Sequence, residues 1–141
     1  MIKFHKDFTL PTEPNSVFVF GSNLAGSHGA GSARFAADMY GAEPGIYFGR
    51  CGTRGEAYAI PTVDSAIEPL PIEIIQMYVD KLIRYSLEYS DTTFFVTRIG
   101  CGIAGFTDEQ MSSLFYGWHT LHNFDLPEEW MQYLPDLLPS E

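Results

Sequence analysis

Two glycine-rich segments are the part of this sequence best suited to binding a ligand. They run from Gly26 to Gly31 and from Gly100 to Gly105, and each follows a short apolar stretch. Glycine lets the backbone approach a ligand closely, and a following helix would turn its positive N-terminal end towards the same place. The chemistry favoured there is the binding of an anion, most simply a phosphate or diphosphate. A single glycine-rich loop is more often only a turn. Two such loops, each between an apolar stretch and a predicted helix, make a ligand site the stronger interpretation.

Three polar residues close to these loops or to a strand end could act on a ligand. Asn23 follows the first apolar stretch, where it could orient a ligand or simply form a turn. His28 lies in the first loop and could act as a general acid or base, bind a phosphate, or remain a surface histidine. Asp64 could activate a water molecule as a base, or it could cap a turn.

Cys101 and Arg98 each have two possible roles. A cysteine at a helix N-terminus can have a lowered pKa and act as a nucleophile, but no histidine or aspartate is arranged by the sequence to support Cys101. A small, closely packed thiol is the alternative. Arg98 could bind a phosphate with two N–H groups or face solvent, and Arg34 and Arg50 have the same two possibilities.

Metal and cofactor sites have no clear pattern in this sequence. His119 and His122 are three residues apart and could share a helix face, but no third ligand accompanies them. Cys51 and Cys101 do not form a Cys-x-x-Cys pair. We therefore expect neither a metal nor a cofactor.

The elements that must position these residues alternate between strands and helices. Short apolar runs rich in β-forming residues predict buried strands, and apolar residues three and four positions apart predict helices. The alternation predicts an α/β fold, namely a three-layer α/β/α sandwich around a mixed, mostly parallel central sheet. The predicted strands cover 17–20, 57–60 and 94–97, with an edge strand or arm within 3–16, and the predicted helices cover 32–40, 71–89 and 107 to about 118.

Turn-forming residues predict where the strands end. Gly21–Asn23 should stop the first strand, and Pro61 should end the strand over 57–60. Residues 62–65 would then form a loop.

The helices differ in how strongly the sequence defines them. The helix over 32–40 has so few polar residues that we expect it to be well buried. Thr107 and Gln110 form a capping box that should begin the third helix. The helix over 71–89 is the clearest, because one of its faces collects apolar residues at helical spacing: Ile72, Ile75, Val79, Leu82 and Ile83.

Length and composition limit the possibilities. The 141 residues fit one domain with a core over about 17–118 and a tail over about 126–141, which Trp130 should pin to the body. Lys and Arg total 8 against 18 Asp and Glu, a formal net charge of -10 that argues against nucleic acid as a partner. No apolar stretch reaches the length of a membrane span, and the N-terminus has no signal-peptide run. We expect a cytoplasmic protein without a membrane partner.

Three segments resemble a macrodomain in order and character: Val17–Asn23, His28–Ala33 and Phe95–Phe106. In that family a buried strand ends at an asparagine, a glycine-rich loop opens the next helix, and a later strand ends in Gly-Ile-x-Gly-aromatic. The resemblance spans about residues 17–118. The sequence is also similar to small phage and bacterial proteins with the signatures Phe-Gly-Ser-Asn-Leu-Ala-Gly and Ile-Gly-Cys-Gly-Ile/Leu-Ala-Gly.

The resemblance implies a small nucleotide ligand of the ADP-ribose class. Asn23 would then orient the distal ribose, and the loop Gly29–Gly31 would wrap that ribose and a phosphate. The second loop would offer its backbone N–H groups to the diphosphate, Phe106 would pack on a ribose, and Asp7 would hold adenine. The ligand-binding residues implied in this way are Asp7, Asn23, Gly29, Gly31, Gly100, Cys101, Gly102, Ile103, Ala104, Gly105 and Phe106.

Three functions from different classes fit the sequence. The first is a macrodomain-like binder of ADP-ribose or a derived nucleotide, acting as reader, sequestering protein or hydrolase, with Asp64 or His28 as the base if it hydrolyses. The second is an acidic interaction module, for example a phage protein that blocks a host protein in the host cytoplasm. The third is a nucleotide hydrolase with a divalent metal on Asp64 and Asp108.

Overall fold

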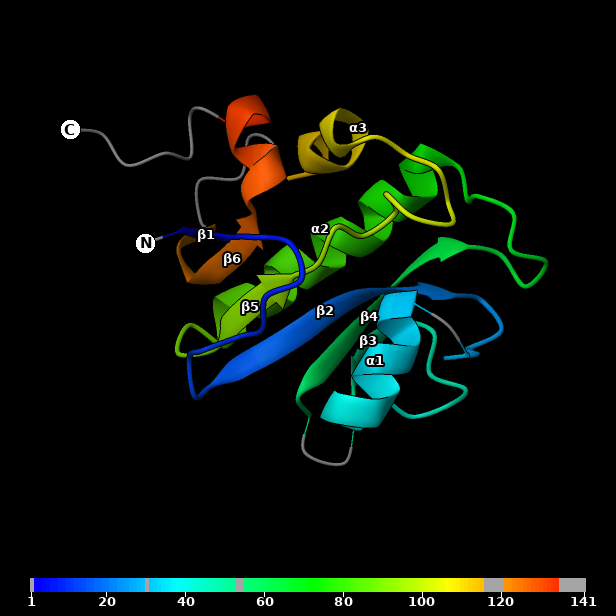
Figure 1. Cartoon of the computed structure of the whole chain (residues 1–141), viewed down its shortest axis with the longest axis horizontal. Helices are drawn as coiled ribbons and strands as arrows, with labels where there is room; N and C mark the ends of the chain where they lie inside the picture. Colours follow the sequence, from blue (N-terminus) through cyan, green and yellow to red (C-terminus); the bar gives the residue numbers. More distant parts are fainter. Residues whose placement is uncertain (1, 30, 53–54, 116–120, 135–141) are drawn as a thin grey trace.

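The computed structural model of the chain describes residues 2–29, 31–52, 55–115 and 121–134. Its centre is a six-stranded sheet in the order β1-β6-β5-β2-β4-β3 (Figure 1). All neighbouring strands run parallel except β3, which pairs antiparallel with β4 at one edge. The strands are β1 Lys3–His5, β2 Ser16–Asn23, β3 Gly49–Cys51, β4 Ala57–Val63, β5 Thr93–Val96 and β6 Phe124–Pro127.

Helices cover both faces of this sheet. Successive side chains on a strand point to opposite faces, so Val17 and Val19 of β2 join the core under α2, whereas Phe18 and Phe20 join the core under α1. Figure 1 shows α1 in front of the sheet and α2 behind it. The predicted three-layer α/β/α sandwich with a mixed, mostly parallel sheet is confirmed. The helices are α1 Gly31–Tyr40, α2 Ile72–Glu88 and α3 Asp108–Ser113, with 3-10 helices η1 Leu121–Asn123 and η2 Glu128–Tyr133.

Helix α2 forms as the sequence predicts. Pro71 precedes its first turn, where a missing N–H costs no hydrogen bond. The predicted apolar face is buried at Ile75, Val79, Leu82 and Ile83. None of the helices in the described residues is long and apolar enough to cross a bilayer.

Two strands are longer than their turn residues predict. Gly21–Asn23 continue β2 instead of stopping it, because they pair with the parallel strand β4. Pro61 lies inside β4 for a related reason. The pairing of β4 with β3 ends at Ala59, so Pro61 lies where that side of the strand is an edge and no ladder donor is needed.

The prediction that the helix over 32–40 is well buried is wrong. Only Ala33 and Ala36 of α1 are buried, while Phe35 and Met39 are exposed at 37% and 59%. A helix that lies alone on one face of a sheet contacts it through one stripe only. One of the apolar side chains of α1 outside that stripe, Phe35, lines a cavity that is described below.

The C-terminal region contributes a strand to the sheet that the sequence does not predict. The capping box at Thr107 is confirmed, but α3 ends at Ser113, and the predicted helix end at Trp118 lies outside the described residues. Leu126 and Pro127, where a tail was expected to begin, complete a strand that pairs with both β1 and β5. Trp130 is fully buried beside it, as predicted for a residue that pins this region.

The central core predicts a contrast between two leucines of α2. Leu82 is fully buried, and replacing it with alanine should lower the free energy of unfolding by about 2–5 kcal/mol because it leaves a cavity. Leu87, on the same helix, is 47% exposed, so Leu87→Ala is the matched control and should cost less than about 1 kcal/mol. Urea denaturation of the three proteins measures both values. Equal losses would contradict the packing of α2 described here.

Candidate ligand-binding cleft

Two adjacent cavities lie where the carboxyl ends of β2, β4 and β5 meet. The larger, of about 650 Å³, extends over the face of the sheet that carries α1. The smaller, of about 360 Å³, lies between the two glycine-rich loops. In parallel sheets ligands bind outside these strand ends. The two cavities share the lining residues Gly31, Ser32, Arg98 and Gly102, so they form one cleft with two chambers.

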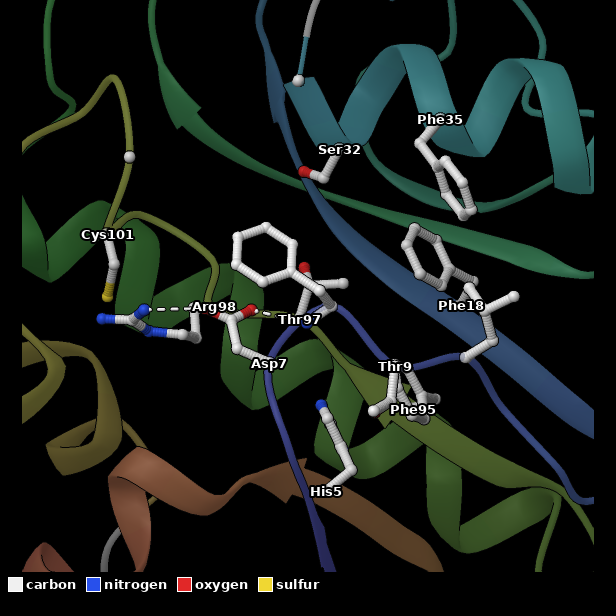
Figure 2. A pocket seen from close by; sticks show the side chains of 14 residues that line it. His5, Asp7, Thr9, Phe18, Ser32, Phe35, Phe95, Thr97, Arg98 and Cys101 are labelled. Carbon is white, nitrogen blue, oxygen red and sulfur yellow. Dashed lines mark hydrogen bonds and ion pairs between the residues drawn. The ribbon is translucent and has the colours of Figure 1, made fainter.

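The larger chamber, here called the aromatic chamber, has a floor of aromatic rings. Phe18 and Phe95 come from the central strands, and Phe35 comes from α1 (Figure 2). The Phe18 ring lies 5.7 Å from that of Phe35 and 6.1 Å from that of Phe95. The segment from Asp7 to Leu10 forms the opposite rim. Such a surface suits a flat ring system.

Phe8 stands at this rim almost without contacts. It is 98% exposed, and its φ of 60° is left-handed, which is unusual for a residue with a side chain. The backbone N–H of Phe8 donates to Oδ1 of Asp7. A large apolar ring held next to an apolar cavity is a further feature of a ligand site.

The smaller chamber, here called the loop chamber, is lined largely by backbone and small side chains. The loop 100–105 follows β5 and uses some of its own N–H groups, since Cys101 donates to the Arg98 carbonyl and Phe106 to that of Gly100. Within the described residues, the N–H groups of Gly102, Ile103 and Ala104 have no protein acceptor. These three residues also line the chamber. Together they form a ready set of donors for an anion.

Gly102 and Gly100 serve this loop in different ways. A side-chain carbon at Gly102 would meet nothing within 4 Å, because it would project into the open cleft. Gly100 has a φ of 74°, and a side-chain carbon there would lie 2.8 Å from the sulfur of Met111. Gly100 is therefore required by the fold of the loop, whereas Gly102 leaves room for a ligand.

Arg98 stands at the junction of the two chambers. Its Nε and one terminal nitrogen donate to both carboxylate oxygens of Asp108, at 3.0 and 2.7 Å. The other terminal nitrogen donates to Asp7 at 2.9 Å, a pair marked in Figure 2. Hydrogen bonds to Asp108 and then to Asp7 raise the pKa of Arg98 above its ordinary value. Arg98 thereby fixes the first turn of α3 and the N-terminal rim to the end of β5.

Asp108 receives two further donors. The indole Nε1 of Trp130 lies 2.9 Å from Oδ1, and the thiol of Cys101 lies 3.4 Å from the same oxygen. The hydrogen bonds from Arg98 hold the pKa of Asp108 below its ordinary value, against the opposing effect of burial. Burial, with the negative charge of Asp108, raises the pKa of Cys101 to about 12. The thiol is therefore protonated at neutral pH, which favours the closely packed cysteine over the nucleophile.

The comparisons with known proteins concern the fold. No protein-family profile matches the sequence, and no curated protein matches it. Solved structures similar to it include the macrodomain of Mycobacterium tuberculosis DarG, with a TM-score of 0.64 over 90% of this chain and 95% of that one, at 19% identity. The fold is macrodomain-like. A protein of unknown function from Bacteroides thetaiotaomicron is also similar, with a TM-score of 0.58 over 82% of this chain and 88% of that one, at 14% identity.

Within this macrodomain-like fold, most of the predicted ligand residues do line the cleft. Asp7 and Cys101 line the aromatic chamber, and Gly31 and Gly102 line both chambers. Those that line the loop chamber are Asn23, Gly29, Gly31, Gly100, Gly102, Ile103 and Ala104. Gly105 and Phe106 are not among the lining residues, and Phe106 packs instead against the core under α2.

The two residues considered as a catalytic base, His28 and Asp64, have contacts of another kind. Nε2 of His28 lies 3.2 Å from the carbonyl of Ile46, and its ring meets that of Phe20 edge to face. Oδ1 of Asp64 accepts from the N–H groups of Ala66 and Glu68 and so closes a turn. Neither residue lines a chamber.

Asn23 combines a position in the cleft with a bond to its own loop. Its side chain donates to the carbonyl of Ser27 and accepts from the N–H of Ser27. Gly26, in the same loop, has a φ of 68°, and a side-chain carbon there would overlap the backbone of Gly45 at 2.6 Å. The turn-forming role of Asn23 is thus present, and the side chain is held at the edge of the loop chamber.

The other candidate cations and metal ligands lie elsewhere. Arg50 donates to the carbonyl of Gly55 and to the hydroxyl of Tyr85, and Arg34 is exposed near Asp38 on α1. His122 is exposed in η1, and His119 lies outside the described residues. In the part of the chain that the structure describes, no three His, Cys, Asp or Glu side chains come together to hold a metal.

The sequence reasoning missed the aromatic chamber. The apolar runs predict Phe18 and Phe95 only as parts of buried strands, and nothing in the sequence indicates a role for His5. The signal was present in α1, where apolar residues exceed what one buried stripe needs, but the sequence does not show that Phe35 faces a cavity.

The Arg98–Asp108 pair predicts a pH-dependent contribution to stability. Asp108→Asn should lower the free energy of unfolding at neutral pH by about 1–3 kcal/mol, because Arg98 loses a charged partner. The pKa of Asp108 in the folded protein lies below the ordinary 3.8, so this stabilisation is complete above that value and disappears as the pH falls through the lower one. Denaturation curves of both proteins from neutral to acidic pH should therefore converge. A constant difference at every pH would contradict the pairing.

Proposed function

We propose that the chain binds ADP-ribose, or a nucleotide derived from it, across the two chambers of this cleft. The observation that carries the proposal is the pairing of an aromatic chamber with a chamber of free backbone N–H groups, joined at Arg98. A dinucleotide-like ligand has the same division into a flat apolar base and a charged diphosphate. The macrodomain-like fold supports the choice of ADP-ribose among such ligands.

The base is assigned to the aromatic chamber. Phe18 and Phe95 lie buried in its floor and Phe35 is partly exposed there, and an apolar aromatic lining suits a purine. Phe8, already exposed at the rim, is placed to cover it. The cavity of about 650 Å³ also leaves room for the sugar attached to the base.

The diphosphate is assigned to the junction and to the loop 100–105. The N–H groups of Gly102, Ile103 and Ala104 would donate to its oxygens, and α1 begins at Gly31 on the other side of the junction. A helix N-terminus adds N–H groups without intrahelical acceptors and a partial positive charge. Arg98 contributes positive charge, although two carboxylates already share it.

The distal ribose is assigned to the far end of the loop chamber. Asn23, Gly29 and Ser27 line that end, where hydroxyl groups would meet amide and backbone partners. Ile67 also lines this chamber and adds an apolar side chain to it.

Binding fits these residues better than hydrolysis does. A general base must reach the water or proton that it acts on, and neither Asp64 nor His28 lines the cleft. A metal-dependent hydrolase on Asp64 and Asp108 has no support either, since Asp64 closes a turn and Asp108 is bonded to Arg98 and Trp130. We therefore propose a reader or sequestering protein.

Titration calorimetry with ADP-ribose tests this function directly. We expect micromolar binding, about -8 kcal/mol, and weaker binding of NAD and of cyclic ADP-ribose. Gly102→Val should reduce affinity at least tenfold with little loss of stability, because the first added carbon meets no protein atom within 4 Å and the residue lines both chambers. Ala25→Val, in an exposed turn outside both chambers, also introduces the branched valine side chain and is the control.

Asn23→Ala should also weaken binding, but its loop could loosen because Asn23 holds Ser27. Its thermal unfolding is therefore measured beside its affinity. Absence of binding to all three ligands would refute the ADP-ribose assignment, and equal affinity of Gly102→Val and wild type would place the ligand outside this cleft.

A further inference from the structure

One histidine of the aromatic chamber has no part in the assignments above. His5, the last residue of β1, stacks on Phe95 with ring centroids 3.8 Å apart and an interplanar angle of 18°. Its Nδ1 lies 2.8 Å from Oδ1 of Asp125 on the neighbouring strand β6. The two side chains are only 12% and 15% exposed. The ring is thus fixed from two directions, and Figure 2 shows it directed into the chamber beside Phe95.

The carboxylate decides which ring nitrogen carries the proton. An ionised carboxylate only accepts hydrogen bonds, so Nδ1 of His5 donates to Asp125. In the neutral ring Nε2 is then an acceptor. Among the described residues Nε2 has no hydrogen-bond partner. With a neutral His5 ring, the chamber contains a positioned acceptor whose partner has to come from a ligand or from water.

Most of the other polar side chains of this chamber are already engaged, and Ser32, whose hydroxyl has no partner among the described residues, lies at the junction with the loop chamber. The hydroxyl of Thr9 donates to the carbonyl of Lys6, and that of Thr97 donates to the carbonyl of Val19. Asp7 accepts from the N–H of Phe8 with one oxygen and from Arg98 with the other. Nε2 of His5 is consequently the acceptor best placed to distinguish one base from another.

We propose that Nε2 of His5 accepts a hydrogen bond from the exocyclic amine of the ligand's base and so selects adenine over hypoxanthine. This inference rests on the proposed function, since it assigns specificity within the same cleft. Hypoxanthine has an oxygen in place of the amine, and that oxygen would direct its lone pairs at the lone pair of Nε2. A buried acceptor left without its donor, facing another acceptor, disfavours the oxo base by about tenfold or more.

The test compares ADP-ribose with inosine diphosphate ribose by titration calorimetry. Wild-type protein should prefer ADP-ribose by about tenfold. His5→Phe retains an aromatic ring to stack on Phe95 but lacks the acceptor, so the ratio of the two affinities should fall towards one. Asp125→Asn keeps the imidazole but no longer fixes its proton on Nδ1, so the ratio should fall there as well. Asp91→Asn, an exposed aspartate outside the cleft, is the matched control and should keep the wild-type ratio.

The ratio, not the affinity, is the deciding quantity, because a purely structural role of His5 would weaken both ligands equally. Retention of the wild-type preference in His5→Phe would overturn the inference and leave Asp7 as the discriminating acceptor. Equal binding of the two ligands by wild type would overturn it too, while the proposed function stands. Binding of neither ligand would overturn both. Nitrogen-15 NMR of the histidines adds a ligand-free check: a His5 ring that carries a proton on Nε2 at neutral pH, whether neutral or charged, would also overturn the inference.

Discussion

The bond between Arg98 and Asp108 is the constraint on which the cleft depends. It joins the end of β5 to the first turn of α3. The two ends of the connecting loop 100–105 are therefore held at a fixed distance from each other. The same arginine reaches Asp7 in the N-terminal rim, and the same aspartate accepts from Trp130 of η2. Segments from both ends of the chain therefore meet at one ion pair. The free N–H groups of Gly102 to Ala104 lie in the loop that this pair closes.

Sheet topology explains why the two chambers adjoin. Parallel strands turn their carboxyl ends to one edge, and the order β5-β2-β4 brings the loops after three different strands together there. β1 and β6 extend the sheet on the side of β5, which places His5 beside Phe95 although the two are far apart in sequence. The parallel pairing of β1 with β6 brings Asp125 to His5, and that of β6 with β5 brings both residues to Phe95. The C-terminal region thus supports the floor of the aromatic chamber.

The sequence predicts those parts of the fold that depend on neighbouring residues in the chain, through apolar periodicity and short motifs. The apolar face of α2, the capping box at Thr107 and both glycine-rich loops were correctly placed because each depends on residues near one another in the chain. Gly21 and Pro61 led to strand ends predicted too early, because the actual ends of β2 and β4 depend on pairing with the neighbouring strands. Of the two roles that the sequence leaves open for Asp64, the structure shows the turn-capping one, and the sequence could not decide between them because the bonds from Ala66 and Glu68 depend on the path of the following loop.

The sequence predicts neither the aromatic chamber nor the pairing of Arg98 with Asp7 and Asp108. Both affect how the cleft could attract an anionic ligand. A protein with a net charge of -10 repels an anionic ligand at long range. Arg98 is the residue that would oppose this, but Asp7 and Asp108 together carry twice its charge. The local attraction for a diphosphate must therefore come mainly from backbone N–H groups, which carry no counter-charge and act only at contact. An acidic surface is compatible with the proposed site because short-range donors would determine affinity there, while the aromatic floor would supply binding energy that is independent of charge.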